Sequence, residues 1–385
     1  MANSNLSNAK NAKNDEFYTQ YHDIQKEINA YLEYNPDVFR GKTVLLPCDD
    51  PEWSNFTKFF AQRFEALGLK KLISTSYAPE SKSYKHPYQP TLFETSDPAF
   101  DAKKTMVNGK IFILERDKSG DGKINVDDLE WSYLEGDGDF RSNEIKKLRD
   151  EADIIVTNPP FSLFREFIMW ITDANKQFLI IGNMNAITYK EVFPQIKYNN
   201  IWLGATNFNT GMYFRVPDNF VYADSYKFER EINGQKVNRV PGVCWFTNIE
   251  HGRRHQPIPL MSMADNLRYS KHKEIKGRTE YEKYDNYNAI EVPFTDSIPN
   301  DYDGVMGVPI SYLDKYCPEQ FEILGMCENE DLYGLKTRTY TTEECKQAYV
   351  DKFGKPGTYD LNASGVVIRD GLKEKVYQRI LIKRK

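Results

Sequence analysis

The chain has 385 residues, of which 40% are hydrophobic and 14% aromatic, so it can form a sizeable core and two or three domains are expected. The formal net charge of −5 excludes a uniformly basic nucleic-acid-binding protein. No apolar run approaches the roughly 20 residues that a membrane helix needs, and residues 1–14 lack the apolar core of a signal peptide. We therefore expect no membrane association.

The first half of the chain alternates between helical and strand-like patterns. Apolar residues at helical spacing predict a helix over residues 15–33. A strand over residues 41–48, a helix over 54–67 and a strand over 71–75 follow. This β-α-β unit is typical of the opening of a doubly wound α/β sheet.

The pattern is less regular further along the chain. A helix is predicted over residues 162–173, and strands are predicted over 110–116, 129–134, 153–157, 178–181, 201–204, 212–216 and 243–248. After about residue 250, Pro, Tyr and charged residues become frequent and the alternation ends. We therefore place a domain boundary near residue 250.

The most informative stretch ends in Asn158-Pro159-Pro160-Phe161. The preceding residues, 154–156, are apolar and β-branched, which favours a central parallel strand. The two prolines end that strand, because neither can donate a backbone hydrogen bond. An amide and an aromatic ring therefore stand at the carboxyl end of a strand, where open α/β sheets bind ligands.

These residue types suit methyl transfer to a planar amino group. An exocyclic adenine nitrogen is a poor nucleophile, because its lone pair is delocalised into the ring. The Asn158 side-chain oxygen and the Pro159 carbonyl can each accept one amino hydrogen, which favours a tetrahedral nitrogen with its lone pair aimed at the methyl donor. Phe161 offers a stacking face worth roughly 1–3 kcal/mol. The alternative is a proline turn in which Asn158 caps the helix beginning near Ser162.

Two further turns are candidates for binding a cofactor. Asp49, Asp50 and Pro51 follow the first strand, where such folds hold a nucleotide-like ligand. The usual Gly-x-Gly is missing, and the acidic residues suit a cationic sulfonium better than a pyrophosphate; helix capping by Asp50 is the alternative. Asp139 could accept a hydrogen bond from an adenine amino group and Phe140 could pack on its ring, although a Gly-Asp turn would explain this stretch as well.

The segment from Asp117 to Asp128 matches much of an EF-hand calcium loop. Its twelfth residue is Asp rather than the usual bidentate Glu, and residues 111–114 before it favour a strand instead of the entering helix. We therefore predict a hairpin turn and no bound metal.

The five cysteines are Cys48, Cys244, Cys317, Cys327 and Cys345. They form no Cys-x-x-Cys pair, which argues against a zinc site and against a disulfide framework. A cytoplasmic location is expected.

The segment from residue 251 to residue 278 is locally basic. Arg253, Arg254, Lys271 and Lys273 are the candidates within it for contacts to DNA phosphates. An ordinary solvated face is the alternative.

Together these residues resemble the adenine-specific DNA methyltransferases, and especially the EcoRI modification methylase family. The resemblance rests on the blocks 15–21, 48–51, 54–56, 138–142 and 157–161. The blocks occur in the family's order and span nearly the whole chain. The ordered set is far more specific than any single block.

The resemblance implies S-adenosylmethionine as the methyl donor and N6 of adenine in double-stranded DNA as the acceptor. It implies cofactor contacts from Tyr18, Thr19, Asp49, Asp50, Pro51, Asp139 and Phe140. It implies that the target base is held by Asn158, Pro159, Pro160 and Phe161.

The fold implied is a Rossmann-like class I S-adenosylmethionine-dependent methyltransferase core with a C-terminal target-recognition region. Residues 1–40 would cover the cofactor, residues 41–250 would form the core with a mixed seven-stranded sheet, and residues 251–385 would recognise the DNA site. The adenine would be flipped out of the duplex. A monomer is expected, with a restriction endonuclease acting on the same site as a candidate partner.

Two other functions remain open at this point. Asn-Pro-Pro-aromatic motifs also suit methyl transfer to an RNA base or a protein glutamine. A DNA-binding protein that has lost catalysis is the second alternative, although the intact Asn158–Phe161 motif argues against it.

Overall fold

The computed structural model describes residues 18–49, 54–78, 98–206, 208, 210–216, 222, 226–227 and 229–385. The chain divides into two units. The first extends to Pro194 and resumes at Ile201–Gly252, and the second comprises Gln195–Asn200 and Arg253–Lys385.

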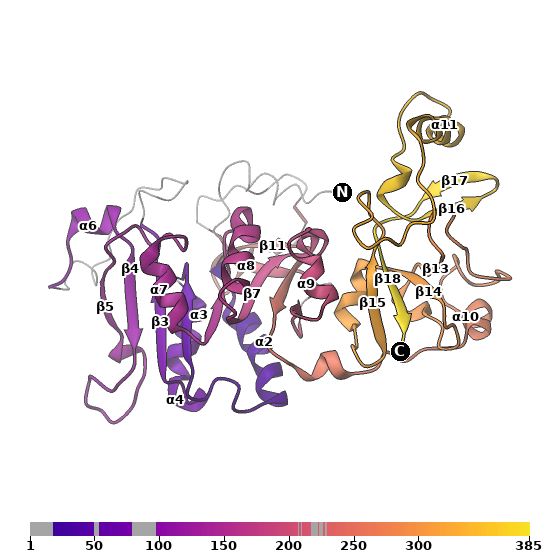
Figure 1. Cartoon of the computed structure of the whole chain (residues 1–385). Coiled ribbons are helices and arrows are strands. Elements are labelled where there is room, and N and C mark those ends of the chain that lie inside the picture. The colour runs from indigo at the N-terminus through magenta and orange to yellow at the C-terminus, as the bar shows by residue number, and fades with distance from the viewer. Residues whose placement is uncertain are drawn as a thin grey trace. The chain divides into compact units, whose positions relative to one another are not determined.

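The first unit is built on an eight-stranded mixed sheet in the order β5-β4-β3-β2-β6-β7-β12-β8. Figure 1 labels its strands β3, β4, β5 and β7. The strands of this sheet are β2 (Thr43–Pro47), β3 (Lys71–Thr75), β4 (Lys110–Leu114), β5 (Glu130–Tyr133), β6 (Ile154–Thr157), β7 (Gln177–Asn183), β8 (Trp202–Leu203) and β12 (Val243–Thr247). The central strands β3, β2, β6 and β7 are parallel, and the strands at both edges are antiparallel. The α/β class predicted from the sequence is confirmed, with eight strands instead of seven.

The order of the central strands creates a switch point between β2 and β6. From β2 the chain moves to β3 on one side, and it later returns to place β6 on the other side of β2. A crevice forms at such a point at the carboxyl ends of the strands. The uninterrupted burial of β2 and β6 reflects their central position, since both of their faces are covered.

The helices of the first unit pack around this sheet. They are α2 (Tyr21–Tyr34), α3 (Asn55–Gln62), α4 (Phe64–Leu67), α6 (Ala102–Val107), α7 (Asn143–Glu151), α8 (Phe164–Thr172) and the short α9 (Phe193–Lys197), which continues into the second unit. Ile28 of α2 and Phe60 of α3 share one buried cluster with Leu46 of β2 and Val156 of β6. The Ser54 hydroxyl caps α3 by accepting from the backbone N–H groups of Phe56 and Thr57.

A separate antiparallel sheet in the first unit has the order β1-β9-β11-β10. It consists of β1 (Tyr18–Thr19), β9 (Met212–Arg215), β10 (Glu231–Ile232) and β11 (Gln235–Val240). The strand predicted over 212–216 therefore exists as β9, but it pairs with the N-terminal segment and not with the main sheet.

The second unit contains a four-stranded sheet in the order β13-β14-β18-β15 and a hairpin, β16-β17. Their bounds are β13 (Ala289–Glu291), β14 (Val305–Pro309), β15 (Phe321–Met326), β16 (Val366–Arg369), β17 (Leu372–Lys375) and β18 (Arg379–Arg384), and the helices are α10 (Met263–Tyr269) and α11 (Thr342–Phe353). The capping box between Thr341 and Glu344 marks the start of α11.

The segment 117–128 connects the antiparallel pair β4 and β5, so the predicted hairpin connection is confirmed. The Asp128 carboxylate accepts from the backbone N–H groups of Lys118, Ser119 and Asn125. Over the described parts of the chain, no group of three or more His, Cys, Asp or Glu residues could hold a metal ion.

Glu27 is a fully buried carboxyl group that joins α2 to the segment after β8. It accepts from the backbone N–H of Ala205 at 2.7 Å, from the Tyr31 hydroxyl at 3.0 Å and from the Thr206 hydroxyl. Burial outweighs these hydrogen bonds and raises the pKa of Glu27 from 4.5 to about 7. The group is therefore largely protonated in the folded protein below that pH.

The Glu27→Gln variant, which mimics the protonated form, is expected to change how stability depends on pH. The raised pKa gives the wild type extra stability that is complete below about pH 4.5 and lost as the pH rises through about 7. Relative to Glu27→Gln, the wild type should therefore lose about 3 kcal/mol of unfolding free energy across this window. Urea denaturation of both proteins between pH 5 and pH 8 measures this; parallel pH profiles would contradict the assignment.

Candidate active site

The carboxyl ends of β2, β3 and β6 lie at one edge of the sheet, because the three strands are parallel neighbours. Cys48 and Asp49 follow β2, Ser76 and Tyr77 follow β3, and Asn158 follows β6. The sequence-predicted candidates from distant parts of the chain are thus brought to one edge of the sheet, at the switch point.

Cys48 adopts a backbone conformation typical of glycine, with φ at +80°. It stands at the turn after β2, where a glycine-rich cofactor loop was expected and not found. The chain therefore makes the tight turn without the glycine, at a conformational cost of roughly 1–2 kcal/mol.

The Cys48→Gly variant is expected to be about 1 kcal/mol more stable than Cys48→Ala, because alanine keeps the Cβ that strains this conformation. Both variants lack the thiol, so their difference isolates the backbone term. Urea unfolding of the two proteins measures it. Equal stability would show that the turn relaxes when the thiol is removed.

Asp49 is 7% exposed and connects three strand ends. Its Oδ1 accepts from the Ser54 hydroxyl at 2.7 Å, and its Oδ2 accepts from the Thr157 hydroxyl at 2.5 Å. Its backbone N–H donates to the Thr75 carbonyl at 2.9 Å, and its carbonyl accepts from the Ser74 hydroxyl. Two other candidates in this turn, Asp50 and Pro51, lie outside the described residues.

The Asn158–Phe161 motif joins β6 to α8. Asn158 is half-buried, Pro159 is buried, and Phe161 begins the 3₁₀ turn η3 (Phe161–Leu163). The N-cap residues of η3 and α8 are Pro160 and Leu163, and neither residue provides a side-chain hydrogen bond to its helix. Asn158 is therefore not the N-cap residue of η3 or of α8.

The predicted cofactor contacts in the N-terminal segment lie close to this motif. Thr19 is the register partner of Phe214 in β9, and the Phe214 ring meets the Phe161 ring edge-on at 6.5 Å between centroids. The Asn55 side chain donates to the Thr19 carbonyl at 2.7 Å, which ties this segment to the start of α3. Tyr18 pairs with Arg215 in the same ladder.

The loop that carries Asp139 and Phe140 is held against the end of β3. Gly138 has φ at +87°, and a Cβ there would lie 2.2 Å from the Ser76 carbonyl oxygen, so only glycine fits. Asp139 forms an ion pair with Arg141 at 2.6 Å, and this hydrogen bonding holds the pKa of Asp139 below its ordinary value.

The structure separates the roles expected of the two residues in this loop. Asp139 is partly exposed at the edge of the sheet. Phe140 is 4% exposed, and its ring packs against Phe167 at 5.0 Å and Trp170 at 5.6 Å between centroids. The Phe140 ring is therefore part of a buried aromatic cluster with two residues of α8.

Tyr77 is a candidate that the sequence pattern did not reveal. Burial, together with the negative charges of Asp137 and Asp139, raises the pKa of Tyr77 to about 12. The Tyr77 hydroxyl is hydrogen-bonded to the Asp137 side chain, which ties the segment after β3 to the loop that carries Asp139. Its position just after the predicted strand over residues 71–75 was the one signal in the sequence that could have identified Tyr77 as a site residue.

The four basic candidates of the second unit differ in exposure. Arg254 is 5% exposed and donates to the Asn199 side chain at 2.7 Å, and Arg253 pairs with Asp314 at 2.6 Å. Lys271 is exposed and pairs with Asp296 at 2.8 Å, and Lys273 is exposed. The two lysines are thus the more accessible members of the set.

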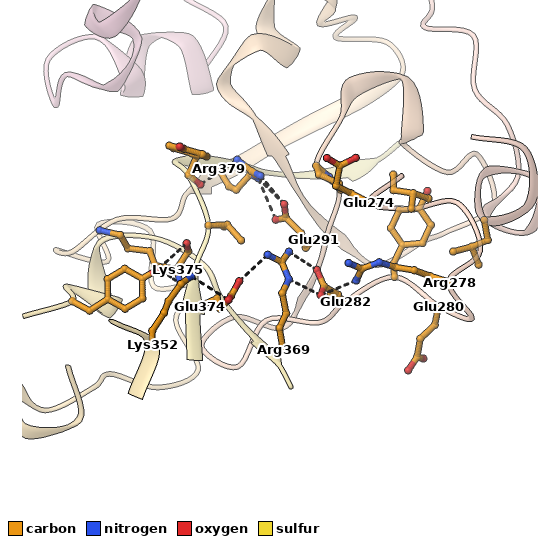
Figure 2. Close-up of a pocket in the computed structure, with 17 residues that line it drawn as sticks. Glu274, Arg278, Glu280, Glu282, Glu291, Lys352, Arg369, Glu374, Lys375 and Arg379 are labelled. Atoms are coloured by element: carbon orange, nitrogen blue, oxygen red, sulfur yellow. Dashed lines mark hydrogen bonds and ion pairs between the residues drawn. The ribbon is translucent and has the colours of Figure 1, made fainter. Parts of the chain in front are cut away.

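The second unit also contains a pocket of about 470 Å³ that the sequence pattern did not indicate. Figure 2 shows Arg369 between Glu282 and Glu374, and Arg379 on Glu291, among its lining residues. Ten charged side chains line it: Glu274, Glu280, Glu282, Glu291, Glu374, Arg278, Lys352, Arg369, Lys375 and Arg379. Carboxylates and cations balance, so the pocket itself does not attract phosphate by net charge.

Over the described residues, no helix is long and apolar enough to cross a membrane. All five cysteines are free thiols.

Comparison with known proteins identifies the family. The family model for the adenine-specific methyltransferase EcoRI matches residues 5–385. The type II methyltransferase M.EcoRI of Escherichia coli is 42% identical over 331 residues, which cover 86% of this chain and 91% of that relative. The type II methyltransferase M.MpnI of Mycoplasma pneumoniae is 36% identical over 339 residues, covering 87% of this chain and 90% of that relative. No solved structure matches the chain. The resemblance seen in the ordered motifs is thus confirmed, and the chain belongs to the EcoRI family of adenine-specific methyltransferases.

Proposed function

We propose that this adenine-specific DNA methyltransferase transfers a methyl group from S-adenosylmethionine to N6 of an adenine in a specific double-stranded sequence. The observation that carries the proposal is the position of Asn158–Phe161 at the carboxyl end of β6, beside the turn after β2. Methyl transfer to adenine needs an acceptor pair and a stacking surface at such an edge, and this motif supplies both.

The residues at this edge fit the proposed methyl donor. When bound, S-adenosylmethionine supplies an electrophilic methyl carbon on a sulfonium centre. The carboxylate of Asp139 offers a hydrogen-bond acceptor for its adenosine part, and Tyr77 lies close to that carboxylate. Tyr18 and Thr19 approach the same region through β1, and we propose that residues 1–40 cover the cofactor.

The motif residues would hold and orient the adenine. The Asn158 Oδ1 and the Pro159 carbonyl each accept one hydrogen of the amino group, so the nitrogen lone pair points towards the methyl carbon. Pro160 fixes the turn that presents them, and Phe161 stacks on the base. The adenine must leave the duplex to reach this edge, at a cost of a few kcal/mol.

We propose that residues 251–385, which include most of the second unit, are the target-recognition region. We propose that the exposed Lys271 and Lys273 contact DNA phosphates. Arg253, which forms an ion pair with Asp314, is a further proposed phosphate contact. The burial of Arg254 favours a supporting role for that residue.

The cellular setting follows from the proposed substrate. Five free thiols and a DNA substrate favour a cytoplasmic enzyme. We propose that it acts as a monomer, and that a restriction endonuclease specific for the same site is its functional counterpart.

Transfer of a labelled methyl group from S-adenosylmethionine to DNA, RNA and protein tests the proposal. Label in duplex DNA as N6-methyladenine at one sequence context is the expected result. Label in RNA or on protein glutamine would favour the first alternative function. Sequence-specific DNA binding without any transfer would favour the inactive DNA-binding protein.

A further inference from the structure

We infer that Asp49 is a positioning residue for Asn158, acting through the Thr157 hydroxyl, and not a ligand of the methyl donor. The inference rests on the proposed role of Asn158. It concerns a bond across the switch point between residues 108 positions apart in the chain.

The geometry links the two strand ends directly. Thr157 is the last residue of β6, immediately before Asn158, and it is fully buried. Its hydroxyl lies 2.5 Å from Asp49 Oδ2 and 2.7 Å from the Pro47 carbonyl oxygen. A hydroxyl carries one proton, and the shorter distance together with the negative charge makes the Asp49 carboxylate its acceptor.

The backbone ladder does not supply this anchor. The register between β2 and β6 pairs Val44 with Ile154 and Leu45 with Ile155, and it does not extend to Thr157. On the other side, Thr157 is paired with Ile180 of β7. On the β2 side, the Thr157 hydroxyl therefore replaces the backbone hydrogen bonds that the ladder lacks there. Thr157 lies one residue before the catalytic amide of Asn158.

Asp49 is itself held in place. Ser54, the N-cap of α3, donates to Oδ1, while the backbone N–H of Asp49 is bonded to Thr75 at the end of β3. Both carboxylate oxygens thus face protein hydroxyls in a buried setting. A carboxylate arranged in this way is a strong, fixed acceptor, which suits positioning.

The consequence for catalysis follows from the demands of the reaction. The Asn158 oxygen must lie within hydrogen-bond reach of the adenine amino group, and a misplacement of about 1 Å can cost about a hundredfold in rate. Loss of the Thr157 anchor should therefore lower kcat and leave donor binding nearly unchanged.

Three variants test the inference. Thr157→Val keeps the shape and removes the hydroxyl, Thr157→Ser restores a hydroxyl, and Asp49→Asn removes the negative charge. We expect Thr157→Val and Asp49→Asn each to lower kcat by about tenfold to a hundredfold. The dissociation constant for S-adenosylmethionine should stay within about threefold, and Thr157→Ser should recover most of the lost kcat. The Asp49→Asn/Thr157→Val double variant should lose little more than either single variant, because both break one bond.

Thr247→Val is the matched control. Thr247 is also a fully buried last residue of a strand in the same sheet, and its hydroxyl donates to the Phe178 carbonyl at 2.7 Å. Phe178 lies near the start of β7, so this bond is at the opposite edge of the sheet. A purely structural effect of losing a buried hydroxyl should therefore appear in its melting temperature and not in kcat.

Two results would overturn the inference alone. One is an unchanged kcat in Thr157→Val, and the other is an Asp49→Asn variant whose donor affinity falls at least tenfold, as expected for a direct ligand. Both outcomes are judged by comparison with a wild-type protein that methylates adenine in DNA. If the wild type transfers no methyl group to DNA, the proposed function fails as well.

Discussion

The Asn158→Ala variant is expected to bind S-adenosylmethionine nearly as tightly as the wild type, while its kcat for DNA methylation falls by about a hundredfold to a thousandfold. The side-chain oxygen is needed only when the amino nitrogen becomes tetrahedral, so its loss should act mainly on the transition state. Thermal unfolding of both proteins shows whether the truncation also changes stability, so that a loss of fold is not mistaken for a loss of catalysis.

Asn158→Asp provides the graded comparison. It keeps an acceptor oxygen at the same position but adds a charge next to the cationic donor, so we expect residual activity above that of Asn158→Ala. Single-turnover kinetics separate the chemical step from product release. A kcat close to that of the wild type in Asn158→Ala would exclude the amide from catalysis.

Local patterns in the sequence predicted the parts of the site that depend on one segment. Three consecutive β-branched or apolar residues before Asn158 predicted β6, and the prolines predicted its end. The sequence also placed the turn at Asp49 and the motif at Asn158 each at the carboxyl end of a predicted strand, and parallel strands end at a common edge.

The parts that the sequence did not predict depend on contacts between distant residues. Nothing near Asp49 indicates that Thr157 will donate to it, and nothing near Tyr18 indicates pairing with Arg215 of β9. The charge pattern around Arg254 could not distinguish a buried arginine from an exposed one, because burial is decided by Asn199 and other distant partners.

Some of the missed features did carry a local signal. The Thr341-x-x-Glu344 spacing is a capping box that marks the start of α11, although the surrounding composition suggested irregular structure. Cys48 illustrates the opposite case. The turn after β2 imposes a positive φ on Cys48, although this conformation is unfavourable for a residue with a side chain.

The Glu291→Gln variant is expected to destabilise the second unit by about 3–5 kcal/mol, because it leaves a buried guanidinium without its counter-ion. Arg379 and Glu291 are 7% and 2% exposed, and they meet at 2.6 Å. The Tyr284 hydroxyl donates to the same carboxylate, so three polar groups of β18, β13 and the preceding segment depend on one another. Both ionic partners line the pocket of the second unit.

The double variant Glu291→Met/Arg379→Met separates the two energetic terms of this pair. Removing both charges removes the desolvation penalty together with the attraction, so the double variant should be more stable than Glu291→Gln. Because the protein has two units, a single global transition need not report on this region. Hydrogen exchange of the β13 and β18 amides does report on it. If Glu291→Gln leaves their protection unchanged, the pair is solvated in solution and contributes little to the stability of the second unit.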